Sequence, residues 1–443
     1  MGIAEDFKTF LDNIKIDNAA TISLRYGEVT AALNKKFRDT ESKTANSLQV
    51  GSYGRGTAIN GVSDLDMIYI MPASKWDSYK DGKQSELLRD AKDAIKARYP
   101  STVVKVDRLV VRVLYKDFHI EVMPAFKQED GSYKYPDTKN DGSWKTTKPQ
   151  AELDEIRESD ARKNNNLRRL CKMARAWKNK HGVAMGGLLI DTLAYNFLES
   201  TTGYDNKSHL YYDEMCRDFF QYLADQPKQS EYAALGSRQR VRVKKRFERK
   251  AKKARDLCQK AIDASGQRNE RQKWRDVFGN GYPAPEVSAN EEASSSYSKA
   301  QYQNTEEFVE DRFPIDVRYH LRINCEVTQK GFRAEMLREL VRKYSLLRPD
   351  KKLRFEITDS SDLPEGTEIY WKVLNRGPEA KRRNMIRGQI VRDTGGWEKR
   401  EESDFKGDHF VECYAILNGV VVARDSILVP ISANKEVVLK NVG

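Results

Sequence analysis

The residues that decide the fold read QVGSYGRGT at positions 49–57 and SDLDMIYI at positions 63–70. The second run predicts a strand, because the residues after its two acids are apolar. Successive side chains of a strand point to opposite faces, so Asp64 and Asp66 share one face of the predicted sheet. Two carboxylates a few Å apart repel each other unless a cation lies between them. The stretch therefore predicts a divalent-cation site at this strand.

The turn before the strand is suited to binding phosphate. Gly51 and Ser52 begin a turn that frees backbone N–H groups, and the Ser52 hydroxyl adds one more donor. Such a concavity can cradle a triphosphate, and Gly54 and Gly56 let the chain bend closely around it. We therefore predict that Gln49, Gly51 and Ser52 bind nucleotide.

A third acid is expected from a neighbouring strand. Residues 118–125 read FHIEVMPA, which predicts a strand that ends before its proline. Ile120 and Val122 would face the core, so Glu121 would face the two aspartates together with His119. Asp107 and Asp117 are rival third acids without such a setting.

Three carboxylates of this kind can hold two Mg²⁺ ions, for which Mn²⁺ can substitute. An Asp-x-Asp pair alone is common on surface loops, and the prediction depends on its combination with the Gly-Ser turn and Glu121. One ion lowers the pKa of an attacking hydroxyl and the other neutralises a triphosphate. We therefore predict that Asp64, Asp66 and Glu121 are both metal ligands and catalytic residues.

The rest of the chain alternates between helical and strand-like patterns. Helices are expected at 5–40, at 81–98 and through most of 164–263, and strands at 64–71, 103–115 and 118–123. After a polar stretch, strands are expected at 315–327, 352–358, 368–374, 408–417 and 420–428, with a hairpin at Asn418-Gly419. The pattern predicts an α/β (α+β) fold with four parts: a core at 1–163, a helical lobe closing the active-site cleft at 164–283, a linker at 284–310 and a β-rich domain at 311–443.

The bulk composition limits the partners and the location. The net charge of +12 and the pI of about 9.2 indicate an anionic partner. The longest apolar run, 183–190, is too short to cross a membrane, and no signal peptide is expected at the N-terminus. The five cysteines are scattered without metal spacing, which favours reduced thiols in a cytoplasmic protein.

The Gly-Ser turn, the Asp-x-Asp strand and the later strand acid before Pro-Ala resemble the cGAS/DncV-like nucleotidyltransferases (CD-NTases) of the polymerase-β type. The resemblance covers roughly residues 40–280 and extends through the helix from Arg169 to Lys178. It implies that a basic residue of this helix contacts the donor triphosphate, and Lys172, Arg175 and Lys178 are the candidates. The third acid of the family is usually aspartate, so Glu121 departs from the pattern.

The C-terminal part resembles the adenylyl/guanylyl-cyclase and SMODS C-terminal sensor domain. Four short segments carry this second resemblance, at 371–377, 386–388, 407–413 and 421–425. It implies a domain that senses a ligand and controls synthesis.

A separate basic segment lies at 238–255, where eleven of eighteen residues are Lys or Arg. A solvated helix face is the ordinary explanation of such a charge run. A surface for nucleic acid or nucleotide is the alternative, because like charges one helical turn apart repel unless an anion offsets them.

Together these features predict an Mg-dependent nucleotidyltransferase that attacks the α-phosphate of one nucleoside triphosphate, ATP among them, with a ribose hydroxyl of another and releases pyrophosphate. By resemblance, the product is a cyclic or short linear oligonucleotide, a second messenger for a downstream effector in bacterial anti-phage (CBASS-like) signalling. A nucleic acid or small ligand is the expected activator. Two rivals stay open: transfer of a nucleotide to a protein, antibiotic or RNA end, and a nucleic-acid-binding module without activity.

Overall fold

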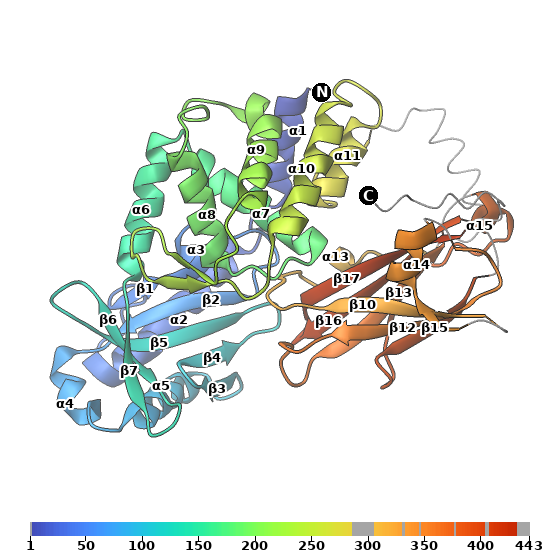
Figure 1. Cartoon of the computed structure of the whole chain (residues 1–443). Helices are drawn as coiled ribbons and strands as arrows, with labels where there is room; N and C mark the ends of the chain where they lie inside the picture. The colour runs from blue at the N-terminus through green and yellow to red at the C-terminus, as the bar shows by residue number, and fades with distance from the viewer. Residues whose placement is uncertain are drawn as a thin grey trace. The chain divides into compact units, whose positions relative to one another are not determined.

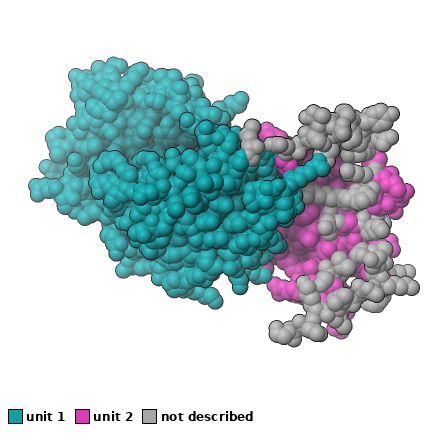
Figure 2. Space-filling model, turned by 90° about the horizontal axis from the view of Figure 1, so that it is seen from above, with its two compact units in different colours: residues 1–180, 185–284 teal, residues 181–184, 285–443 magenta. Residues whose placement is uncertain are grey.

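The protein is described here from a computed structural model, over residues 2–285, 305–329, 333–344, 347–375, 378–403 and 407–431. It divides into two compact units, which Figure 2 colours separately. Unit 1 comprises residues 1–180 and 185–284, and unit 2 comprises residues 181–184 and 285–443. Most of the predicted linker at 284–310 lies outside the described residues.

The central sheet of unit 1 has the strand order β1-β2-β5-β4-β3, with β6 and β7 continuing from β5. Its strands are β1 (Ser47–Gln49), β2 (Asp64–Ile70), β3 (Val103–Asp107), β4 (Val110–Leu114), β5 (His119–Lys127), β6 (Tyr133–Asp137) and β7 (Ser143–Thr147). β2 and β5 run parallel, and the β4–β5 pair is antiparallel, as the short link between them predicts. β5 passes through Pro124, whereas the sequence predicted that it ends at Met123. Pro124 lies beyond the part of β5 that pairs with β4, where a residue without an N–H is tolerated.

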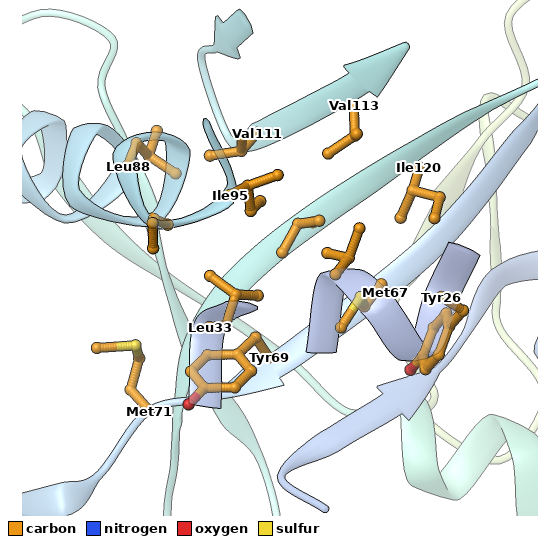
Figure 3. Close-up of a cluster of buried hydrophobic side chains, with 14 of the residues drawn as sticks. Tyr26, Leu33, Met67, Tyr69, Met71, Leu88, Ile95, Val111, Val113 and Ile120 are labelled. Carbon is orange, nitrogen blue, oxygen red and sulfur yellow. The ribbon is translucent and has the colours of Figure 1, made fainter. Parts of the chain in front are cut away.

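The core of unit 1 lies between one face of this sheet and the helices α2 (Ala19–Arg38) and α5 (Gln84–Arg98). Figure 3 shows Leu33 of α2, Leu88 of α5 and Met67 of β2 pointing into the same apolar layer. Ile120 and Val122 are completely buried in this layer, as the alternation along β5 predicts. The opposite face of β2 and β5 carries Asp64, Asp66 and Glu121 toward the start of the two strands. Farther along the same face lies a smaller apolar cluster that includes Ile68 and Ala125.

The N-terminal helix predicted at 5–40 is interrupted. The structure has α1 (Ile3–Asn13) and α2, separated by residues 14–18. This stretch reads IKIDN, and its β-branched residues, Asp and Asn are weaker helix formers than Ala, Leu, Lys or Glu. The absence of Gly and Pro was therefore an insufficient reason to predict a continuous helix.

Helices of unit 1 gather on the other side of the sheet (Figure 1). They are α6 (Pro149–Arg162), α7 (Asn166–His181), α8 (Gly187–Glu199), α9 (Tyr212–Ala224), α10 (Glu248–Ile262) and α11 (Glu270–Phe278). α1 joins them, because Phe7 makes edge contacts with Trp274 at 5.1 Å and with Tyr282 at 5.4 Å between ring centroids. Chain segments more than 260 residues apart thus share one aromatic cluster.

A hairpin that the sequence did not predict interrupts the helical region. Strands β8 (Glu231–Ala233) and β9 (Arg240–Arg242) pair antiparallel, and Figure 1 shows the hairpin in yellow-green beside α8. The first half of the basic segment at 238–255 is therefore strand and loop. Only its second half, from Glu248 onward, belongs to the helix α10, whose Arg249, Lys252 and Lys253 are exposed.

Unit 2 is built from two four-stranded sheets, β11-β10-β12-β15 and β14-β13-β16-β17. Its strands are β10 (Arg322–Thr328), β11 (Glu335–Met336), β12 (Lys352–Asp359), β13 (Glu368–Asn375), β14 (Ile390–Arg392), β15 (Glu398–Glu402), β16 (Gly407–Leu417) and β17 (Val420–Ile431). Its short helices are α13 (Val309–Arg312), α14 (Leu337–Tyr344) and α15 (Pro378–Arg382). One core of apolar residues, which includes Phe355, Trp371 and Val411, lies between the sheets. The predicted hairpin is confirmed, because Asn418 and Gly419 have φ of 51° and 78° between β16 and β17.

All five cysteines are buried and unpaired: Cys171, Cys216, Cys258, Cys325 and Cys413. Burial raises the pKa of each of these thiols. Within the described residues, the helices are too short or too polar to span a bilayer.

Candidate active site

Three acids meet on the face of the sheet that is turned away from the core. Asp66 of β2 lies opposite Glu121 of β5 in the parallel register, and Asp64 lies opposite His119. One carboxylate oxygen from each of Asp64, Asp66 and Glu121 lies within 4.8 Å of the other two, and all three residues are half-buried. The rival acids Asp107 and Asp117 do not belong to this cluster. The predicted convergence of three carboxylates is therefore present, and its oxygen-only donor set suits a hard divalent cation.

Gly51 brings the turn against Asp66. Its φ of 65° is left-handed, and a Cβ at this position would lie 1.8 Å from Asp66 Oδ2. The Val50 N–H donates to the Asp66 carbonyl oxygen at 3.0 Å, which ties the turn to β2. Residues from Gly51 to Gly54 form one helical turn, α3. A residue with any side chain at position 51 would displace the carboxylate, so the close approach of turn and acid requires glycine.

Glu121 has two polar neighbours on the same face of the sheet. Arg112 of β4 lies directly opposite Glu121, and its Nε is 3.4 Å from Glu121 Oε1. His119 Nε2 lies 2.9 Å from Arg112 Nη2 and 3.2 Å from Glu121 Oε1. A guanidinium only donates, so His119 Nε2 accepts from Arg112 and has no proton to give to Glu121. Arg112 is therefore the group that offsets the charge of Glu121, and His119 fixes the position of Arg112.

Asp66 and Glu121 open onto a cavity of about 380 Å³ within unit 1, a volume in the range of small-molecule sites, and Asp64 is not among the residues that line it. Its lining includes Val50, Gly51, Asp66, Met67, Ile68, Val110, Glu121, Met123, Tyr135, Thr146, Thr147, Pro149, Glu152, Leu188, Gln239 and Arg240. The sheet, the Gly51 turn, α6, α8 and the β8–β9 hairpin all contribute. Gly51, Asp66 and Glu121 were predicted as site residues, whereas Gln49 and Ser52 lie next to the lining without being part of it.

Behind the turn, a buried cluster of charges joins the turn to the helices. Asp191 of α8 is completely buried and accepts from Arg55 Nε at 2.8 Å, Thr57 Oγ1 at 3.0 Å and Arg175 Nη1 at 2.6 Å. Burial acts to raise the pKa of Asp191, but Arg175 and Arg55 outweigh it and hold the pKa at about 2. Arg55 also pairs with Glu152 of α6 at 3.3 Å. The cluster fixes the Gly51 turn against α6, α7 and α8.

Arg175 is therefore already engaged, and its predicted contact with phosphate does not fit its position. Its side chain is 6% exposed, bound to Asp191, and it also donates to the Gly187 carbonyl oxygen at 3.1 Å. Lys172 is half-buried and Lys178 is buried. Burial first, and then the charge of Arg168, lowers the pKa of Lys172. Neither lysine lines the cavity, so nucleotide binding by Lys172 and Lys178 stays a prediction.

Three residues in or beside the site, Arg112, Gln239 and Arg240, were not predicted as site residues from the sequence. Arg112 is one of many basic residues, and nothing in its segment marks it as a partner of Glu121. Arg240 was noticed only as part of the basic segment, and Gln239 carries no signal. The β8–β9 hairpin brings Gln239 and Arg240 to the cavity. The sequence does not reveal this hairpin, because its strands of three residues are too short to show a periodic pattern.

Residues 1–160 match the family described as the Second Messenger Oligonucleotide or Dinucleotide Synthetase (SMODS) domain. The N-terminal domain belongs to this SMODS family of nucleotidyltransferases. Residues 303–432 match the Adenylyl/Guanylyl and SMODS C-terminal sensor domain. The SMODS domain thus contains the whole acid cluster, and the sensor match falls on the β-rich unit 2, as both resemblances predicted.

Individual relatives are more distant. The cytidylate cyclase of Staphylococcus aureus is 26% identical over 121 residues, which are 27% of this chain and 28% of the relative's length. The chain therefore spans less than a third of that curated relative. Among solved structures, E. coli MS115-1 CdnC in complex with HORMA-deltaN is 14% identical with a TM-score of 0.49, over 63% of this chain and 98% of CdnC. Vibrio cholerae DncV cyclic AMP-GMP synthase with a linear intermediate is 16% identical with a TM-score of 0.43, over 55% of this chain and 71% of DncV.

Proposed function

We propose that this protein joins nucleoside triphosphates into a cyclic or short linear oligonucleotide and releases pyrophosphate. The observation that carries the proposal is the set of three carboxylates within 4.8 Å, beside a glycine turn and a cavity of about 380 Å³. The membership of residues 1–160 in the SMODS family supports an oligonucleotide or dinucleotide product. We further propose that this product is a second messenger in anti-phage signalling in the cytoplasm, where nucleoside triphosphates and reduced thiols are found.

The chemistry follows from the residues that surround the cavity. Asp64, Asp66 and Glu121 would hold two Mg²⁺ ions, which would supply positive charge to neutralise the phosphates and to lower the pKa of the attacking hydroxyl. The Gly51 turn presents backbone N–H groups to the triphosphate of the donor nucleotide. A ribose hydroxyl oxygen bonds to the α-phosphorus, the bond from that phosphorus to the bridging oxygen breaks, and pyrophosphate leaves. The hydroxyl proton passes to a carboxylate of the cluster, and we assign this role to Glu121.

The test uses the full chain with the four ribonucleotides, and separately the four deoxyribonucleotides, in Mg²⁺ or Mn²⁺. Mass spectrometry identifies the products, and a coupled assay measures pyrophosphate. We expect free oligonucleotides, and we expect Asp66→Asn to reduce their formation by roughly 10³-fold or more, since the substitution removes a metal ligand. Asp117→Asn is the matched control, because Asp117 is an exposed acid in the turn between β4 and β5 and lies outside the cluster.

The outcomes separate the rival functions. Nucleotide mass found on a protein, antibiotic or RNA end, with no free oligonucleotide, would favour transfer to a large acceptor. A cellular effect that survives Asp64→Asn together with Asp66→Asn would favour a binding module without activity. Because the sensor domain is expected to control synthesis, the assay is repeated with nucleic acid and with cell extract from infected bacteria before inactivity is concluded.

A further inference from the structure

The cavity beside the acid cluster has walls of two kinds. One wall comes from β2, β5 and the Gly51 turn and carries Asp66 and Glu121. The other comes from the end of β7 and the β8–β9 hairpin and carries Thr146, Thr147, Gln239 and Arg240. The first wall accounts for the donor nucleotide. The second has no role in the chemistry described so far.

The hairpin is held firmly against the sheet. Gln239 Oε1 accepts from the Lys148 N–H at 3.1 Å and from Thr147 Oγ1 at 3.2 Å, and Gln239 Nε2 donates to the Thr146 carbonyl oxygen at 3.0 Å. The turn before it is fixed as well. Ser237 Oγ donates to Glu152 Oε1 at 3.0 Å, and Gly236 leaves no room for a side chain, since a Cβ would lie 2.1 Å from the Ala151 carbonyl oxygen.

The contacts of the hairpin with the sheet place the cationic Arg240 at the cavity. Among the described residues that line it, Arg240 alone has a positively charged side chain, while Asp66, Glu121 and Glu152 are acids. The side chain of Arg240 is 84% exposed and its ion pair with Glu231 is long, at 3.5 Å. A pair of this kind contributes little to stability, so Arg240 can exchange Glu231 for a stronger anion at small cost.

The substrates supply such an anion. Two nucleotides must be bound at once for one to attack the other, and each carries a 5′-triphosphate. The carboxylates of the cluster with their cations, and the turn, serve the donor triphosphate, whereas the second triphosphate needs a cation of the protein itself. A planar guanidinium suits this purpose, because it can make two parallel hydrogen bonds to phosphate oxygens.

We propose that Arg240 binds the 5′-triphosphate of the acceptor nucleotide, the one whose ribose hydroxyl attacks, and that Gln239 positions Arg240 through its three hydrogen bonds. This inference rests on the proposed function. It makes Arg240 a specificity residue that selects triphosphorylated acceptors over nucleosides.

The first experiment measures binding without turnover. The full chain with Mg²⁺ is titrated in a calorimeter with the α,β-methylene analogues of ATP, GTP, CTP and UTP, which cannot be cleaved between the α- and β-phosphates. We expect two nucleotides per chain and expect Arg240→Ala to weaken one of them by about 10- to 100-fold, the usual range for a lost hydrogen bond to a charged group. Arg240→Lys should restore part of the loss. Arg242→Ala is the matched control, an exposed arginine of the same strand that does not line the cavity.

The second experiment compares acceptors in the active enzyme. One donor triphosphate is offered with an acceptor nucleoside that carries either a 5′-triphosphate or a free 5′-hydroxyl, and the first joined product is quantified by mass spectrometry. We expect the wild type to prefer the triphosphate and Arg240→Ala to lose about tenfold or more of that preference. An equal loss of rate with both acceptors would place the contact on the donor and overturn the inference.

The two proposals fail in different ways. If the wild type joins nucleotides and Arg240→Ala binds and selects acceptors as the wild type does, only the role of Arg240 is overturned. If the wild type binds none of the four analogues and also forms no product in the assays with nucleic acid and infected-cell extract, the proposed function is overturned and the inference with it.

Discussion

Glu121 pairs with Arg112 on its own face of the sheet, and His119 fixes the position of Arg112, so the two residues together hold a side chain that is one methylene longer than aspartate. We predict that His119→Ala raises the Mg²⁺ concentration for half-maximal activity by about 10- to 100-fold, the usual effect of removing a residue that orients a metal ligand. The measurement is pyrophosphate release against Mg²⁺ concentration, with circular dichroism as the check on folding. An unchanged Mg²⁺ requirement would show that the position of Glu121 does not depend on His119.

Gly51 allows a second prediction at the scale of one residue. Gly51→Ala places a methyl group on Asp66 Oδ2 and adds a side chain to a left-handed backbone, and we expect loss of nucleotide joining in a folded protein. Gly82→Ala is the control, because Gly82 has a φ of 70° and a Cβ added there would meet nothing within 4 Å. Because the added methyl group meets no neighbour, Gly82→Ala should change only the backbone strain. We expect it to lower the free energy of unfolding by about 1 to 2 kcal/mol, measured by thermal unfolding. Equal activity of the two variants would contradict the proposed contact of turn and acid.

The residues of the site were predictable to different degrees. Asp64, Asp66 and Glu121 could be found because alternation along two strands fixes which side chains share a face. The pairing of Arg175 with Asp191 could not be predicted, since Asp191 lies 16 residues later on another helix and only packing brings them together. Arg240 was hidden among eleven basic residues that have no common periodicity.

At the scale of elements, the buried Asp191 cluster predicts how the stability of unit 1 depends on pH. The pKa of Asp191 lies near 2, below its ordinary value of 3.8. The ionised carboxylate therefore contributes fully to the free energy of unfolding above pH 3.8, and this contribution is lost as the pH falls toward 2. Asp191→Asn removes the charge that pairs with Arg55 and Arg175, and we expect a loss of about 3 to 5 kcal/mol at pH 7.

The measurement is urea unfolding of the wild type and Asp191→Asn between pH 7 and pH 3. The difference in free energy of unfolding should shrink as the pH approaches the pKa of Asp191. A difference that stays constant with pH would mean that Asp191 is not the titrating partner. Asp154→Asn on the exposed face of α6 is the control and should change stability by less than about 0.5 kcal/mol.

Elements with strong local signals were predicted well. The strands β2 and β12 and the Asn418-Gly419 hairpin match their expected positions, because alternation and a type I′ turn are local properties. The break between α1 and α2 was missed because the prediction considered only Gly and Pro as helix breakers and not the weaker helix formers in IKIDN. The β8–β9 hairpin was missed because it depends on tertiary contacts, those of Gln239 with β7, which no local pattern shows.

At the scale of the whole molecule, each unit has its own apolar core, which predicts two unfolding transitions. Phe355→Ala should lower the stability of unit 2 by about 3 to 5 kcal/mol and leave the transition of unit 1 in place. Leu33→Ala should lower the stability of unit 1 by about 2 to 5 kcal/mol. Differential scanning calorimetry checks both variants, and a joint shift of the two transitions would contradict independent cores.

The burial of every cysteine makes it possible to attach labels that report the separation of the two units in solution. Thiols that are shielded from solvent and held in the protonated form react slowly with maleimides. A single cysteine introduced at an exposed position, such as Lys253 of α10 or Arg392 of β14, would therefore take up a fluorophore or spin label selectively without removal of the native thiols. One such pair, with one label in each unit, would report changes in their separation as nucleotide or a sensed ligand is added.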